Sequence, residues 1–126
     1  MIFGQSNTVV SFLYVTKRDR ALAFYGERLG LDLQGSDDFG DFLDGGGALI
    51  RMTVMPEHVA SPHPVLGWEV HDIHAAASAL SKRGIQFTIY DGMGQDELGV
   101  WTSSDGNATV AWFSDPDGNV LSLSQA

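Results

Sequence analysis

Hydrophobic residues recur at helical spacing in two stretches of the chain. The first stretch covers residues 18–30, and its apolar positions lie three and four residues apart, as on one face of a helix. These positions are Leu22, Tyr25 and Leu29. Thr16 and Asp19 resemble a capping box, and Gly30 is suited to end the helix. The pattern therefore predicts a helix with a defined start and end.

The second helical stretch covers residues 72–84. Its apolar positions are Ile73, Ala76, Ala77 and Leu80. Asp72 can accept hydrogen bonds from the free backbone N–H groups of the first turn. Lys82 and Arg83 suit the negative end of the helix dipole, and Gly84 is suited to end the helix.

Strand-like runs precede and follow each helix. They cover residues 8–15, 31–35, 41–45 and 48–55 around the first helix, and 65–70, 85–90, 100–104, 108–114 and 119–124 around the second. Turn-forming residues at 44–47, 104–107 and 115–119 separate several of these runs. Because strands and helices do not alternate strictly, a doubly wound parallel sheet is not expected.

The order of strand, helix and further strands occurs twice, which predicts two βαβββ modules. Module one covers about residues 7–56 and module two about residues 62–125. The connecting segment, residues 55–64, holds three of the four prolines. A chain of 126 residues fits one domain of ordinary size. We therefore expect a single α+β domain.

Charge and composition exclude several classes of partner. Seven Lys and Arg residues against 16 Asp and Glu residues give a net charge of −9. Binding to nucleic acid or to an anionic membrane surface needs clustered basic residues, so neither partner is expected. The absence of Cys excludes disulfides and thiolate chemistry and fits a cytoplasmic location. We expect no signal peptide and no membrane span.

Three segments resemble a known family. They are FYGERLGLDL (24–33), VHDIHAAASALSKRGI (70–85) and AWFSDPDGNVLSL (111–123). Together they resemble the vicinal oxygen chelate superfamily, which comprises glyoxalases, bleomycin resistance proteins and extradiol dioxygenases. The resemblance implies a cup-shaped mixed sheet made from both modules, with a ligand in its concave face. The Asp-Pro-Asp-Gly sequence also suits any hairpin, so these motifs indicate a fold more than a function.

The resemblance also implies positions for metal ligands, and this chain lacks suitable residues there. The implied positions are Val10, Val65, Ser122 and one of Leu49, Ile50 or Arg51. None of these side chains binds a divalent ion in the usual way. We therefore expect no metal and no cofactor. His63 could join Glu69 in an unusual site, and His58, His71 and His74 are more typical of solvated positions.

Alternation along the strands assigns side chains to two faces. The face that packs against the helices is expected to hold Leu13, Val15, Ile50, Met52, Leu66, Trp68, Val70, Phe113, Leu121 and Leu123. Val120 is expected on the opposite, open side. The candidate ligand-binding residues on the open side are Phe12, Tyr14, Arg51, Glu69, Trp112 and Ser122. Aromatic rings with few polar groups are typical of a pocket for an organic ligand. The same rings could instead fill space or a dimer interface. Residues 91–99 could form a mobile lid or a plain hairpin loop.

Three functions remain open from the sequence. The first is a metal-free binding protein for a small aromatic or cationic molecule. The second is a metal-independent enzyme, in which Arg51 polarises a substrate oxygen and Glu69 or Tyr14 moves a proton. The third is a metal-dependent lyase, isomerase or dioxygenase. No catalytic residue is assigned, and a homodimer is expected because the sheet has open edges.

Overall fold

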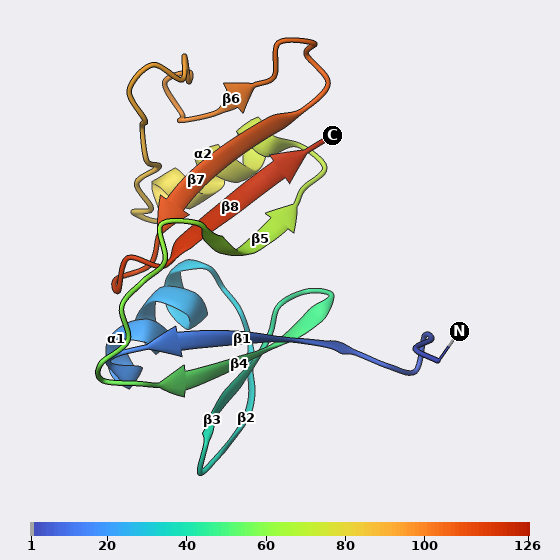
Figure 1. The fold of residues 1–126 in the computed structure, drawn as a ribbon, viewed down its shortest axis with the longest axis vertical. Coiled ribbons are helices and arrows are strands. Elements are labelled where there is room, and N and C mark those ends of the chain that lie inside the picture. Colours follow the sequence, from blue (N-terminus) through green and yellow to red (C-terminus); the bar gives the residue numbers. More distant parts are fainter. Residues whose placement is uncertain (1) are drawn as a thin grey trace. The chain divides into compact units, whose positions relative to one another are not determined.

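The computed structural model describes residues 2–126, which form two compact units, one ending at Val59 and one covering Ala60–Ala126. Each unit contains one four-stranded sheet and one helical segment (Figure 1). The strands of the first unit are Val9–Val15 (β1), Leu33–Asp37 (β2), Gly40–Asp44 (β3) and Ala48–Val54 (β4). Their order in the sheet is β1-β4-β3-β2, with β1 parallel to β4 and the other neighbours antiparallel.

The second unit repeats this arrangement. Its strands are Pro64–Glu69 (β5), Trp101–Thr102 (β6), Thr109–Ser114 (β7) and Val120–Gln125 (β8). Their order is β5-β8-β7-β6, and β5 is parallel to β8. The predicted α+β class and the repeated βαβββ order are therefore confirmed.

The first helical segment departs from a regular α-helix. It begins as an α-helix over Arg18–Leu22 (α1) and continues as a π-helix over Ala23–Arg28 (η1). The predicted capping box is wrong, because Lys17 occupies the N-cap position and makes no side-chain cap bond. Thr16 instead accepts a hydrogen bond from the Arg20 guanidinium at 3.1 Å. Gly30 follows the segment with a φ of 76°, which only glycine adopts easily.

The second helix forms as predicted. It covers Ile73–Lys82 (α2), and the Asp72 side chain accepts a hydrogen bond from the Ala75 N–H at 3.1 Å. Gly84 ends this region with a φ of 88°. None of the helices within residues 2–126 is long and apolar enough to cross a membrane.

Two predicted strands are shorter than expected or absent. Residues 85–90 form only one isolated bridge, between Phe87 and Phe113, and residues 100–104 are reduced to β6. For residues 85–90 the physical reason lies in Gln95, whose side chain accepts from the Tyr90 N–H at 2.7 Å and donates to the Thr88 carbonyl at 2.9 Å. A side chain therefore satisfies backbone groups that a strand partner would otherwise satisfy.

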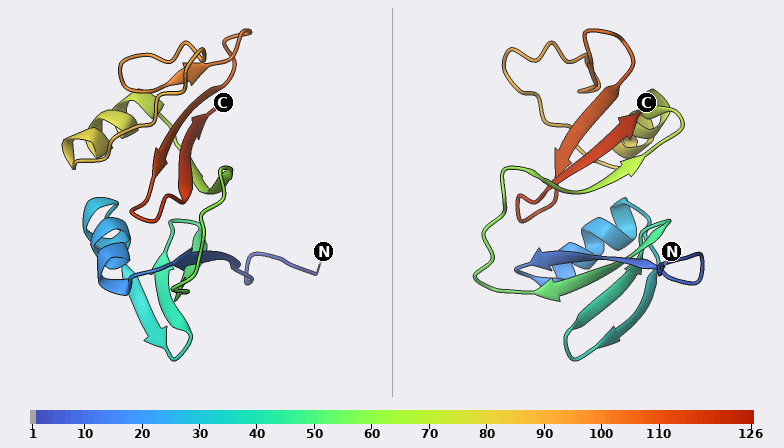
Figure 2. Two further views of the ribbon diagram at one scale, coloured as in Figure 1. Left: turned by 60° about the vertical axis from the view of Figure 1, so that its left-hand side comes forward. Right: turned by 45° about the vertical axis from the view of Figure 1, so that its right-hand side comes forward.

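Strand alternation places the core as predicted on most strands. The buried side chains include Leu13, Val15, Ile50, Met52, Phe113, Leu121 and Leu123. Figure 2 shows the helix of each unit lying over one face of its own sheet. Leu66, Trp68 and Val70 are only half-buried, and β5 has an irregular register between Pro64 and Leu66. Val120 was expected on the open side but is buried, at the point where it pairs with Pro64 and Ser114.

An ion pair between exposed Arg18 and buried Asp41 joins α1 to β3. Asp41 is 2% exposed, and its carboxylate accepts from Arg18 Nε at 2.9 Å, from Arg18 Nη2 at 2.8 Å and from Ser36 Oγ at 2.6 Å. The hydrogen bond from Arg18 holds the pKa of Asp41 below its ordinary value of 3.8, against the opposing effect of burial. This charge-assisted contact fixes the start of the helix on the sheet.

We expect Asp41→Asn to lower the free energy of unfolding by about 2 kcal/mol at neutral pH. Because the folded-state pKa of Asp41 is depressed, its contribution is complete above the ordinary carboxyl pKa and is lost as pH falls through the lower, folded value. Urea unfolding at a series of pH values should therefore show the two proteins converging in acid. Asp38→Asn, at an exposed position of the same unit, is the matched control. A difference that persists unchanged in acid would contradict this account.

Candidate functional site

The open face of the first sheet carries a charged side chain among aromatic rings. Arg51 on β4 pairs in register with Phe12 on β1 and with Phe42 on β3. Its guanidinium carbon lies 4.9 Å from the centre of the Phe42 ring and 5.9 Å from that of Phe39. Its Nη2 lies 3.5 Å from an Asp37 carboxylate oxygen. Arg51 therefore reaches over β3 to the β2–β3 hairpin, where cation–π contacts and an ion pair hold it.

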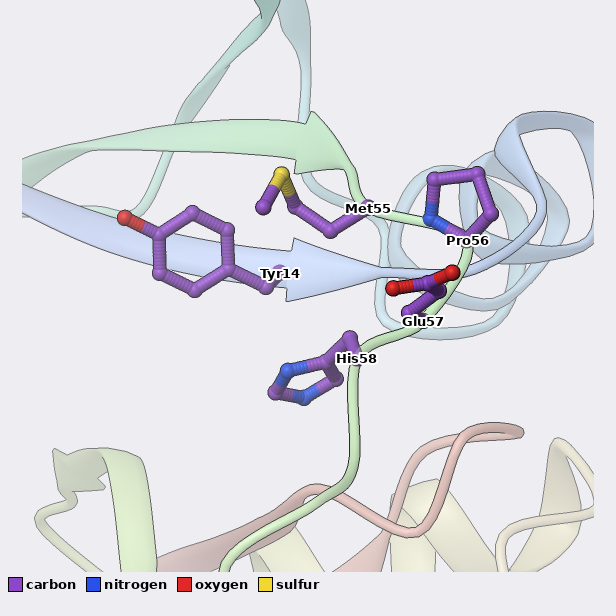
Figure 3. Close-up of a pocket in the computed structure, with 5 residues that line it drawn as sticks. All are labelled: Tyr14, Met55, Pro56, Glu57 and His58. Carbon is purple, nitrogen blue, oxygen red and sulfur yellow. The ribbon is translucent and has the colours of Figure 1, made fainter.

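A pocket of about 450 Å³ lies at the end of β1 and β4. Tyr14 lines it together with Met55, Pro56, Glu57 and His58 (Figure 3). The rings of Tyr14 and His58 have their centres 6.0 Å apart and are inclined by 44°. Figure 3 shows the phenol lying along β1 with the His58 ring beside it. The volume is within the range of sites for small molecules.

The open face of the second sheet carries an aromatic cluster next to polar groups. Trp112 on β7 packs edge-on against Tyr90, with ring centres 5.6 Å apart, and lies 6.4 Å from the ring of Trp101. Ser122 on β8 is the register partner of both Trp112 and Gly67. A Cβ at position 67 would collide with the Ser122 hydroxyl oxygen. Gly67 therefore leaves room for that hydroxyl beside the indole.

Glu69 follows two residues after Gly67 on β5, so both lie on the same face of the strand. It pairs in register with Ser124 and is exposed. A carboxylate, a hydroxyl and three aromatic rings thus share the open face of the second sheet.

The predicted site residues fall into two groups. Phe12, Tyr14 and Arg51 lie in the first unit, and Glu69, Trp112 and Ser122 lie in the second. Within each unit the assignment to the face opposite the buried core agrees with the observed alternation. The expectation that Arg51 and Trp112 line one pocket stays a prediction, because the two residues belong to different units.

Sequence reasoning missed several partners of these residues. It did not identify Phe42, Phe39 and Asp37 around Arg51, or Tyr90 and Trp101 beside Trp112. The sequence carries no clear signal for Phe42 on the open face, because alternation along β3 is broken by the buried, charged Asp41 beside it. The place of His58 beside Tyr14 depends on a turn after β4, and strand periodicity carries no signal for it.

Within residues 2–126, no group of three or more His, Cys, Asp or Glu side chains is placed to hold a metal ion. The positions that the resemblance implied remain Val10, Val65, Ser122 and the stretch from Leu49 to Arg51. His63 precedes β5. Regular alternation would place His63 on the same face as Glu69, but the register shift between Pro64 and Leu66 breaks that alternation. The metal-free state stays a prediction.

The loop over residues 91–99 is held by two side chains. Gln95 bridges Tyr90, Thr88 and Gly99, and the Asp96 carboxylate accepts from the N–H groups of Leu98 and Val100. His74 on α2 lies 2.9 Å from the same carboxylate. Burial favours a higher pKa for Asp96, but these hydrogen bonds outweigh it and lower the pKa. This bonding is typical of an ordered loop more than of a mobile lid.

Comparisons with known proteins agree with this architecture. The family model described as the Glyoxalase/Bleomycin resistance protein/Dioxygenase superfamily matches residues 6–123. Among solved structures, a superfamily member from Sphaerobacter thermophilus is 20% identical, covers 100% of both chains and has a TM-score of 0.71. A glyoxalase/bleomycin resistance protein/dioxygenase from Alicyclobacillus acidocaldarius is 19% identical and has a TM-score of 0.74. The match covers 94% of this chain and 90% of that protein.

A glyoxalase family protein from Enterococcus faecalis is 18% identical, with 98% and 99% coverage and a TM-score of 0.70. At this level of identity the solved structures show a shared fold. No curated protein matches the chain.

Proposed function

This chain belongs to the Glyoxalase/Bleomycin resistance protein/Dioxygenase superfamily, and we propose that it binds a small aromatic or cationic organic molecule without a metal ion. The proposed ligand-binding residues are Phe12, Tyr14, Arg51, Glu69, Trp112 and Ser122. The proposal needs no catalytic residue and no cofactor.

The aromatic cluster of the second sheet carries this proposal. Trp112, Trp101 and Tyr90 offer ring faces and edges, and the Ser122 hydroxyl lies beside the indole in a space that Gly67 leaves open. Rings of this kind bind flat apolar molecules, and a nearby hydroxyl fixes their orientation. The Glu69 carboxylate on the same face favours a ligand that carries positive charge.

The first sheet supports the same proposal in a second way. Phe12 is 61% exposed and Tyr14 is 42% exposed, and the two lie on the same face of β1. Neighbouring exposed rings of this kind are typical of a binding surface. Arg51 is already paired with Asp37 and stacked on Phe42, so its charge is partly compensated. This arrangement favours a binding surface over a group that polarises a substrate oxygen.

We further propose a homodimer in the cytoplasm. Strand β1 is an edge of its sheet, and Val9 on it is 69% exposed. An exposed apolar edge strand invites pairing with a second copy. The lack of Cys is compatible with a reducing compartment.

Native mass spectrometry of protein purified without added metal tests these proposals together. We expect the mass of a dimer and no stoichiometric divalent ion. EDTA should leave the melting temperature unchanged, because EDTA lowers it only when it removes an ion that stabilises the folded state. A bound organic molecule that copurifies should be lost in Trp112→Leu and retained in the control Trp112→Phe. Near one metal per chain, removed by His63→Ala, would contradict the metal-free reading. A monomer would contradict the dimer.

A further inference from the structure

A turn held by backbone hydrogen bonds forms one wall of the Tyr14 pocket. The Met55 N–H donates to the Val15 carbonyl oxygen at 2.7 Å, which adds one hydrogen bond beyond the end of β4. The His58 N–H donates to the Met55 carbonyl oxygen at 2.9 Å and closes a four-residue turn. Pro56 occupies the second position of this turn, where its fixed φ is favourable. The wall is therefore preformed, so ligand binding costs little conformational entropy in this segment.

The side chains around this pocket suit a flat ring with a positive charge. The rings of Tyr14 and His58 lie beside one another, with centres 6.0 Å apart (Figure 3). The face of a phenol ring attracts cations, and the thioether of Met55 makes favourable contacts with aromatic rings. Glu57 adds a carboxylate to the lining. A neutral ring would gain from the stacking alone, whereas a cationic ring gains from the stacking and from both electrostatic contacts.

We propose that this pocket binds a positively charged aromatic ring of the small-molecule ligand. The inference rests on the proposed function, and it adds that the aromatic ring itself carries the positive charge and that this pocket holds it. A volume of about 450 Å³ accommodates a ring system of two fused rings. The net charge of −9 also favours the approach of a cation.

Arg51 is a cation that could oppose this proposal, because it lies on the same face of the sheet. Its register partner on β1 is Phe12, whereas Tyr14 pairs with Thr53. Its guanidinium lies over Phe42 and beside Asp37, on the β3 side of the sheet. Its charge is therefore directed away from β1 and compensated by a carboxylate.

Two probes with the same ring frame separate charge from stacking. N-methylquinolinium is a permanent cation, and quinoline is uncharged at neutral pH. We expect N-methylquinolinium to bind about tenfold more tightly than quinoline, in calorimetric titrations, and to shift the methyl NMR signal of Met55. Glu57→Gln should weaken the cation about threefold and leave quinoline unchanged. Tyr14→Leu should weaken the cation about tenfold.

Glu27→Gln is the matched control, since it removes the same charge from an exposed position of the same unit outside the pocket. It should leave both affinities unchanged, and melting curves verify that each variant is folded. Equal affinity of the two probes, equal effects of Glu57→Gln and Glu27→Gln, or no binding of either probe overturns the inference. Cation binding that Trp112→Leu abolishes, without a shift at Met55, overturns the inference and leaves the proposed function intact.

Discussion

Replacing Phe113 by alanine should lower the free energy of unfolding by about 4 kcal/mol. Phe113 is 0% exposed and lies on the helix side of β7. Its ring packs edge-on against Phe87, with centres 5.4 Å apart, and its backbone forms the only bridge that joins residues 85–90 to a strand in the described chain. Loss of the ring leaves a cavity that the rigid sheet cannot close. Denaturant unfolding monitored by circular dichroism measures the effect.

Phe12→Ala is the matched control for this substitution. It removes the same ring from an exposed position on the open face of a strand, so we expect a change within about 0.5 kcal/mol. The same variant should weaken ligand binding, because Phe12 belongs to the proposed site. Equal losses of stability in both variants would show that the two faces of the sheets are wrongly assigned.

Asp115→Ala should lower the free energy of unfolding by about 3 kcal/mol. Asp115 is 5% exposed, and its carboxylate accepts from the N–H groups of Asp117 and Asn119 at 2.9 and 2.8 Å. It also accepts from Asn119 Nδ2 at 2.8 Å, and Asn119 is itself 2% exposed. Alanine removes the carboxylate that accepts from the buried Asn119 and the half-buried Asp117, and losing the partner of a buried donor costs more than the bond itself contributes. Thermal and urea unfolding measure the loss.

A second Asp-Gly turn in the same unit provides the comparison. Asp105 accepts from Ser103 Oγ at 2.6 Å and from the Asn107 N–H at 3.0 Å, but it is exposed. Water can replace the carboxylate there, so Asp105→Ala should cost much less than Asp115→Ala. If the two substitutions cost the same, burial does not set the importance of these turns.

The fold was predictable because strand alternation reports burial directly. Leu13, Val15, Ile50 and Met52 are apolar at every second position, and each is buried. Helix ends were predictable where the signal is a single residue, as with Asp72 and Gly84. The start of the first helix was not, because the N-cap position lies at Lys17, one residue after Thr16.

Residues 85–90 show the limit of reasoning from composition. Their composition favours a strand, yet the Gln95 side chain bonds the Tyr90 N–H and the Thr88 carbonyl. Only Phe87 forms a bridge to a strand in the described chain. The composition of a segment carries no information on which side chain will compete for its hydrogen bonds. Gln95 follows Tyr90 and Thr88 closely in the sequence, so the competition depends on the conformation of the loop between them.

The candidate site was predictable only one strand at a time. Alternation placed Arg51 on the open face of β4, and the structure agrees. Its contacts with Phe42 and Asp37 depend on how far β3 and the β2–β3 hairpin are shifted against β4, which no single strand specifies. The Tyr14 pocket likewise depends on a turn that follows β4.

The parallel pairing of β1 with β4 and of β5 with β8 has a consequence during protein synthesis. In each unit the last strand to be made, β4 or β8, is an interior strand that lies between two earlier ones. Until it emerges from the ribosome, β1 or β5 has no neighbour and β3 or β7 keeps an open edge. Each unit therefore passes through a period with unpaired, apolar strands, when contacts with chaperones matter most.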